Sequence, residues 1–120
     1  MDSILTEEHR MVKKSVSELA RREFAPRAAE IDRMATFPWD NFKKLAQQGF
    51  TGMNVPEQYG GSGADVLNFV LAIEEIAKVC GSTALVLLAH HFATQGIVLA
   101  GSPDVKARFL PQLAKGEKLA

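Results

Sequence analysis

The chain has 120 residues, a length that favours one domain whose core can bury about two-thirds of the unfolded surface. Hydrophobic residues make up 47% and charged residues 23%, which is typical of a globular domain and excludes a disordered segment. Fourteen basic residues balance fourteen acidic ones, so no global field attracts nucleic acid or an anionic membrane, and neither is expected as a partner. The single cysteine, Cys80, excludes an internal disulfide and is expected to act as a small buried hydrophobe.

Neither a targeting signal nor a membrane span is expected. Met1 to Arg10 has no apolar stretch and is acidic, which favours a cytoplasmic location. The most apolar segment, residues 83–100, contains polar residues such as His90 and Thr94 and falls short of the roughly 20 apolar residues that a span needs. This segment is predicted to be a buried helix.

The first helix is predicted to begin after Thr6. The Thr6 side chain can cap it, and Glu7 and Glu8 lie in the first turn, where the helix dipole favours negative charge. Its inner face is expected to carry Val12, Val16, Leu19 and Ala20. The helix is expected to end or kink near Pro26, although residues 27–34 can continue it.

A short second helix and a long connection are predicted next. Thr36 or Phe37 precedes Pro38, which suits the first helical position, and Gly49 closes the helix. Its inner residues are Phe42 and Leu45. From residue 50 to residue 63 the helical period is lost among glycines and prolines, and loops of this length are usually functional.

Three further helices follow. In the next helix, apolar residues recur at intervals of three and four, and Glu74, Glu75 and Lys78 face away from them. The apolar residues are Val66, Phe69, Val70, Ile73, Ile76, Ala77 and Cys80. Ser82 is then expected to cap a central helix that is apolar on every face over residues 84–89.

Gly101 is expected to end the central helix, and Ser102, Pro103 and Asp104 to open the last one. The inner stripe of that last helix is predicted to be Val105, Phe109 and Leu113. The pattern predicts an all-α fold, an orthogonal or up-down bundle of about five helices, in one domain covering residues 1–120.

None of the polar clusters indicates an active site. The adjacent His90 and His91 point about 100° apart on a helix, so they are not expected to share a metal ion. One of the two histidines is expected to be hydrogen-bonded in the interior and the other to face solvent or a ligand. The glycine-rich segment 59–63 lacks the lysine of a nucleotide loop, which favours a tight turn over a phosphate cradle. The carboxylate pairs Glu7–Glu8 and Glu74–Glu75 are expected to be solvated, so no catalytic residue is predicted.

The order of several segments resembles the acyl-CoA dehydrogenase family, and the resemblance runs over essentially the whole chain. The segments are Leu5–Glu8, Ala25-Pro26, Ile31-Asp32, Phe37-Pro38, Gly49-Phe50, Val55–Gly63, Glu74–Ala77, Gly101-Ser102, Phe109–Leu113 and Gly116–Ala120. Residues 79–83, with Ala89 and His90, are most similar to the short-chain, butyryl-CoA type. The resemblance implies the amino-terminal helical domain of an enzyme whose middle β-domain and carboxy-terminal helical domain are not in this sequence.

In this family a glutamate removes the α-proton of an acyl-CoA thioester, while the β-hydrogen leaves as hydride to FAD. Electrons then pass to an electron-transfer flavoprotein, and the enzyme is a homo-oligomer. The resemblance places the catalytic glutamate and most of the FAD site outside this sequence, so the chain alone is expected to be inactive. It assigns one wall of the acyl pocket to the central helix, at Ala84, Leu85, Leu88, Ala89 and Phe92. Bulky residues there favour short to medium acyl groups.

Two other functions stay open from the sequence. The segment can be a helical packing or assembly module with no ligand of its own, in which case a large exposed apolar patch is expected. It can also belong to a relative that uses the same architecture as a flavin oxidase or monooxygenase.

Overall fold

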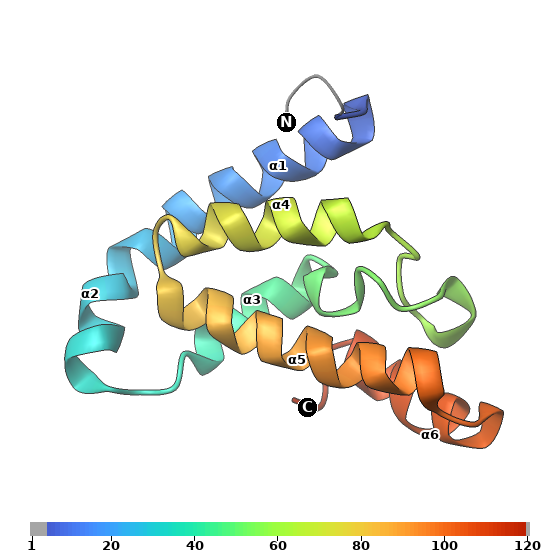
Figure 1. Cartoon of the computed structure of the whole chain (residues 1–120). Helices are drawn as coiled ribbons and strands as arrows, with labels where there is room; N and C mark the ends of the chain where they lie inside the picture. Colours follow the sequence, from blue (N-terminus) through green and yellow to red (C-terminus); the bar gives the residue numbers. More distant parts are fainter. Residues whose placement is uncertain (1–4, 120) are drawn as a thin grey trace.

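The computed structural model describes residues 5–119, and within them the chain is helical with no strand (Figure 1). The α-helices are α1 (Glu7–Leu19), α2 (Ala25–Met34), α3 (Trp39–Gln47), α4 (Val66–Ala77), α5 (Gly81–Ala100) and α6 (Pro103–Ala114). Because α1 and α2 form one continuous rod, the bundle has five helical rods, which confirms the predicted fold class. The targeting expectation for residues 1–4, and Ala120 of the last segment, lie outside the described residues.

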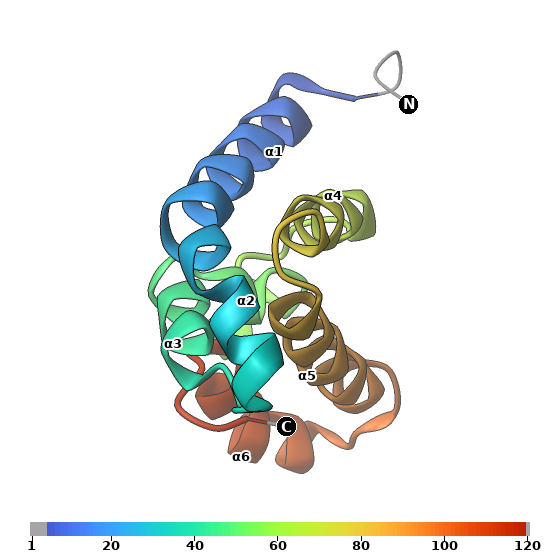
Figure 2. The same cartoon turned by 90° about the vertical axis from the view of Figure 1, so that its left-hand side faces the viewer.

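The rod of α1 and α2 passes through Pro26 without a break. A π-helical turn, η2 (Ala20–Phe24), joins the two helices, and Pro26 follows in the first turn of α2 (Figure 2). Proline removes one backbone donor and crowds the preceding turn, and a π-turn is a common place for a helix to absorb such a disturbance. Residues 27–34 therefore continue the first helix. The rod ends where Ala35 takes a left-handed conformation, with φ of 52°.

The amino-terminal ends of α1 and α4 are joined by polar contacts. The Thr6 side chain caps α1, as predicted, by accepting from the backbone N–H of His9. His9 Nδ1 accepts from the Thr6 N–H, so its Nε2 carries the proton and donates to Asp65 at 2.8 Å. Asp65 also caps α4 by accepting from the Asn68 N–H, and this bond, together with the His9 bond, lowers the pKa of Asp65.

The helices pack in about two layers. The molecule measures 41 × 38 × 19 Å, and the shortest dimension leaves room for two helices of about 10 Å each. α4 packs between α1 and α5, and α6 packs against α5 (Figure 1). The main core is formed by buried residues of the first rod, α3, α4 and α5: Val16, Leu19, Ala20, Phe24, Ile31, Leu45, Met53, Ala72, Ile76, Cys80, Ala84 and Leu87.

The connection between α3 and α4 is ordered by its own backbone. It contains two short 3₁₀ turns, η3 (Phe50–Gly52) and η4 (Glu57–Tyr59). The N–H groups of Gly61, Ser62 and Gly63 donate to carbonyls of Pro56, Gly52 and Val55 in the same segment. These donors are therefore engaged, and Gly60, with φ of 91°, makes the turn that only glycine adopts readily. The tight-turn interpretation of the glycine-rich segment is confirmed.

The predicted inner face of α4 was partly wrong. Val66 and Val70 are exposed, whereas Leu71, Ala72 and Glu75 are buried. The face that packs is rotated because α4 is covered by α1 on one side and α5 on another, so its contacts do not follow a single stripe. The buried Glu75 carboxylate accepts a hydrogen bond from Lys78 at 2.6 Å, which corrects the expectation that this carboxylate is solvated.

The ends of the last two helices also differ from expectation. Ser82 does not cap α5; Cys80 is the N-cap residue, and its thiol lies 3.0 Å from the Thr83 hydroxyl. Ser102 does cap α6, as predicted. The buried residues of α6 are Leu110, Leu113 and Ala114, while Phe109 is exposed, so the predicted stripe of α6 was wrong at Phe109.

α5 is long and apolar enough, with a mean hydropathy of 1.5, to span a membrane by length and composition. A core helix of a folded domain passes the same test. In this bundle its inner side carries Thr83, Leu87, His90 and Thr94, all buried. His90 Nε2 donates to the carbonyl of Leu113 at 2.9 Å and so ties α5 to α6.

We expect Leu87→Ala to lower the free energy of unfolding by about 2–5 kcal/mol, because Leu87 is 1% exposed and its truncation leaves a cavity. The matched control is Leu85→Ala on the same helix, where the side chain is 65% exposed and the expected change is within about 0.5 kcal/mol. Urea unfolding of the two variants measures both values. Equal losses would contradict the assignment of the inner side of α5.

His90 makes stability dependent on pH. Burial lowers the pKa of His90, an effect that its contacts with the Leu113 and Thr51 carbonyls oppose. The unfolded chain therefore binds a proton that the folded chain resists, and stability falls as pH drops below the ordinary histidine pKa of 6.5. We expect His90→Gln, whose amide can still donate to Leu113, to show a smaller loss of stability than the parent between pH 7 and about pH 5. Urea unfolding at a series of pH values measures the slope, and an unchanged slope would contradict this role of His90.

Candidate functional site

α5 has one apolar side that no other helix covers. In Figure 1 it lies in front of α3, and in Figure 2 its outer side forms the edge of the molecule. Leu85 and Phe92 are each 65% exposed and Leu99 is 83% exposed. At about 100° per residue these three side chains, with the exposed Ala89, fall within one narrow stripe. Leu88, half-buried, lies at its edge, and we call these five residues the α5 stripe.

The structure places four of the five predicted pocket residues on this stripe: Leu85, Leu88, Ala89 and Phe92. The fifth, Ala84, lies beyond Leu88 on the buried side of the helix and packs in the main core, only 5% exposed. Spacing alone could not separate Ala84 from the others, because residues one apart can both border a pocket. Whether any of the five touches an acyl group stays a prediction.

The stripe continues into a small apolar hollow of about 200 Å³. It is lined by Leu85, Val86 and Ala89 of α5, by Phe37 before α3, and by Leu119. The ring of Phe37 lies 4.6 Å from that of the half-exposed Trp39, tilted by 48°, and this pair extends the apolar surface away from α5. Phe37, Val86 and Leu119 were not among the predicted pocket residues. Phe37 and Leu119 both lie in the segments that resemble the family, and that was the available signal.

The two adjacent histidines have different surroundings, as expected from their spacing. His90 is buried and its ring meets Phe42 edge-on at 5.4 Å. His91 is half-buried and stacks on Phe69 of α4 at 3.6 Å. Burial lowers the pKa of His91, and the neighbouring His90 lowers it further. Among residues 5–119 no group of three acidic, histidine or cysteine side chains is placed to bind a metal ion.

The chain matches the family model for the acyl-CoA dehydrogenase N-terminal domain over residues 6–117. It is 42% identical to the short-chain specific acyl-CoA dehydrogenase of Clostridium acetobutylicum, over 99% of this chain and 32% of that protein. It is 46% identical to the cyclohex-1-ene-1-carbonyl-CoA dehydrogenase of Syntrophus aciditrophicus, over 95% of this chain and 27% of that protein. The chain thus spans about a third of the length of the curated relatives it matches.

Solved structures agree with these sequence matches. Butyryl-CoA dehydrogenase of Megasphaera elsdenii superposes with a TM-score of 0.90 and 32% identity, over 99% of this chain and 32% of that chain. A chain from the structure of the electron transferring flavoprotein of Acidaminococcus fermentans gives a TM-score of 0.91 and 34% identity over the same shares. The resemblance read from the sequence is therefore confirmed, and the chain belongs to the acyl-CoA dehydrogenase family as its N-terminal helical domain.

Proposed function

We propose that this domain serves an enzyme that introduces an α,β double bond into short- to medium-chain acyl-CoA thioesters, with the α5 stripe as one wall of the acyl pocket. The observation that carries the proposal is the exposed apolar side of a helix whose other side is the core. Large apolar side chains in water are costly when clustered, and such clusters mark surfaces that another polypeptide or a ligand covers. Relatives named for short-chain and cyclic acyl-CoA substrates support the substrate class.

The size of the stripe residues supports the preference for chain length. Phe92 and Leu88 are bulky members on successive turns of the helix, while Ala89 between them is small. An alkyl chain that lies on Ala89 gains about 0.8 kcal/mol for each buried methylene until it meets a bulky side chain. A longer chain then gains nothing more and must displace the wall, so exclusion sets the preference.

FAD is the cofactor that the family implies. The residues described here do not form a whole flavin site: the hollow at the stripe is about 200 Å³ and entirely apolar, with no donor for a diphosphate. A second hollow of about 550 Å³, beside the amino terminus of α5, is lined by the Asp32 carboxylate, which would repel a diphosphate. We therefore propose that FAD, which would accept the hydride, is held mainly by polypeptide beyond this domain, and we assign it no residue here.

An electron-transfer flavoprotein is the proposed electron acceptor. The support is that a similar chain occurs in the solved structure of such a flavoprotein from Acidaminococcus fermentans.

A domain exchange tests the proposed function. Residues 6–117 would replace the matching domain in the short-chain specific acyl-CoA dehydrogenase of Clostridium acetobutylicum. We expect the chimera to oxidise butyryl-CoA and to reduce an electron-accepting dye. In the chimera, Phe92→Ala should raise kcat/KM for acyl chains that are a few carbons longer, by about fourfold for each methylene that the enlarged pocket accepts.

The control is Phe109→Ala, which removes the same side chain from an exposed position on α6. Its chain-length profile should match that of the unmodified chimera. A folded, flavin-containing chimera whose profile is the same with and without Phe92 would rule out the pocket role of the stripe.

A second candidate function, a helical assembly module, is favoured by the same exposed stripe. If no other polypeptide covers it, the stripe should pair with a second copy, because two apolar faces remove each other from water. We expect the 120-residue chain to self-associate in sedimentation velocity at micromolar concentration, and Leu85→Glu with Phe92→Glu to sediment as a monomer. Since both side chains are exposed, the double variant should keep its helical circular dichroism. A parent chain that is monomeric at every concentration would exclude this function.

A further inference from the structure

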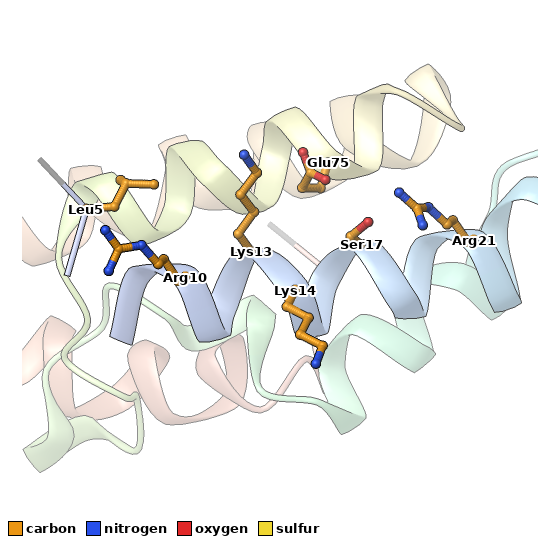
Figure 3. A pocket seen from close by; sticks show the side chains of 7 residues that line it. All are labelled: Leu5, Arg10, Lys13, Lys14, Ser17, Arg21 and Glu75. Atoms are coloured by element: carbon orange, nitrogen blue, oxygen red, sulfur yellow. The ribbon is translucent and has the colours of Figure 1, made fainter. Parts of the chain in front are cut away.

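A basic groove runs between α1 and α4. It is a hollow of about 420 Å³ lined by Leu5, Arg10, Lys13, Lys14, Ser17 and Arg21 of the amino-terminal segment and α1, and by Glu75 of α4. Figure 3 shows Lys13, Ser17 and Arg21 directed toward the α4 side, where Glu75 lies, while Lys14 points away from α4. Four of the seven lining residues are cations, on a chain whose formal net charge is zero. All four cations belong to α1 and the π-helical turn η2 that continues it, and Lys13 and Arg21 lie on the α4 side.

Three of the four cations of the groove are arranged in a line, with Ser17 between two of them. Arg10, Lys13, Ser17 and Arg21 follow each other at intervals of three, four and four, so they share one face of α1. From residue 10 to residue 21 the helix rises about 16 Å, which is the length of about five extended residues. A compact anion such as a single phosphate would reach one or two of these side chains, whereas a linear anion reaches all of them.

Among residues 5–119, most of this positive charge is not neutralised by an ion pair. No ion pair among residues 5–119 engages Lys13, Lys14 or Arg21, while Arg22, Arg27 and Lys44 are each paired to a carboxylate. Arg10 is paired with the exposed Glu7 at 3.6 Å, so the positive charge that a ligand meets comes mainly from Lys13 and Arg21. The one carboxylate in the groove, Glu75, is already paired with Lys78 at 2.6 Å and adds little repulsion. A ligand would therefore meet a positive groove.

We propose that the α1–α4 groove is the docking surface for an acidic peptide segment of a partner protein. The linear cations favour an extended chain. A membrane plane or a nucleic acid would extend beyond the groove over the rest of the chain, which carries all of the fourteen acidic residues except Glu75. Charge pairing of this kind sets orientation and association rate. The proposal stands independently of the catalytic function proposed above.

The test uses ¹⁵N-labelled 120-residue chain and an oligoglutamate peptide of about six residues, long enough to span the groove. We expect amide shifts confined to residues around Arg10–Arg21 and Glu75, and binding that weakens as salt is raised, because the Debye length shortens. Lys13→Glu with Arg21→Glu should weaken binding about tenfold or more. The matched control is Lys115→Glu with Lys118→Glu, the same charge change on exposed lysines outside the groove, which should bind as the parent does.

Two competing probes distinguish other anions. Sodium tripolyphosphate and phosphatidylserine vesicles are each titrated into the same labelled chain. Shifts at the groove from either probe that are as large as those from oligoglutamate would overturn the proposal in favour of phosphate or membrane recognition. Equal loss of peptide binding in the control and groove variants, or peptide shifts elsewhere on the chain, would also overturn it. Peptide shifts at the groove that the groove variant alone removes would support it.

Discussion

The structure depends on how α5 is covered. In a bundle about two helices thick, a helix buries the sides that face its neighbours and leaves its outer side to solvent. α5 uses that side for Leu87, His90 and Thr94, and His90 fixes it to α6 through the Leu113 carbonyl. The other side carries the α5 stripe to the surface. The same helix therefore anchors the core and presents the apolar wall that the proposed function uses.

The two surfaces that stand out on this domain differ in physical kind. The α5 stripe is apolar, so whatever covers it gains free energy in proportion to the area removed from water, with little dependence on salt. The α1–α4 groove is positive, and exposed charges contribute less to affinity than to the rate and orientation of an encounter. A rigid bundle can keep both surfaces in place because the helices beneath them share one core, which reaches from Val16 on α1 to Leu87 on α5.

Several polar contacts that hold the bundle together join residues far apart in the sequence. His9 donates to Asp65, and the buried Asn41 amide donates to the Thr83 hydroxyl, across gaps of 56 and 42 residues. Buried polar groups are costly unless paired, so these pairs favour one arrangement of the helices over others that would bury the same apolar area. The spacing of residues in the sequence does not predict such a pair, because each partner looks like an ordinary polar residue within its own segment. The row of cations on α1 differs in this respect, because the spacing of Arg10, Lys13 and Arg21 is visible in the sequence. The sequence does not show that α4 packs beside them to form the other wall of a groove.

The helices and the family could be predicted from the amino-acid sequence alone. Caps at Thr6 and Ser102, the stop at Gly101 and the turn at Gly60 are set by local backbone chemistry, which is why they could be predicted. The family resemblance assigned Leu85, Ala89 and Phe92 to one pocket wall, and their spacing of four and three is consistent with one side of α5. Which side of each helix faces the core became clear from the packing: Glu75 is buried and Val66 exposed on α4, while Ala84 lies inside and Phe92 outside on α5. The sequence of a helix that is apolar on every face does not indicate which face will be buried, because this depends on the neighbouring helices that pack against it.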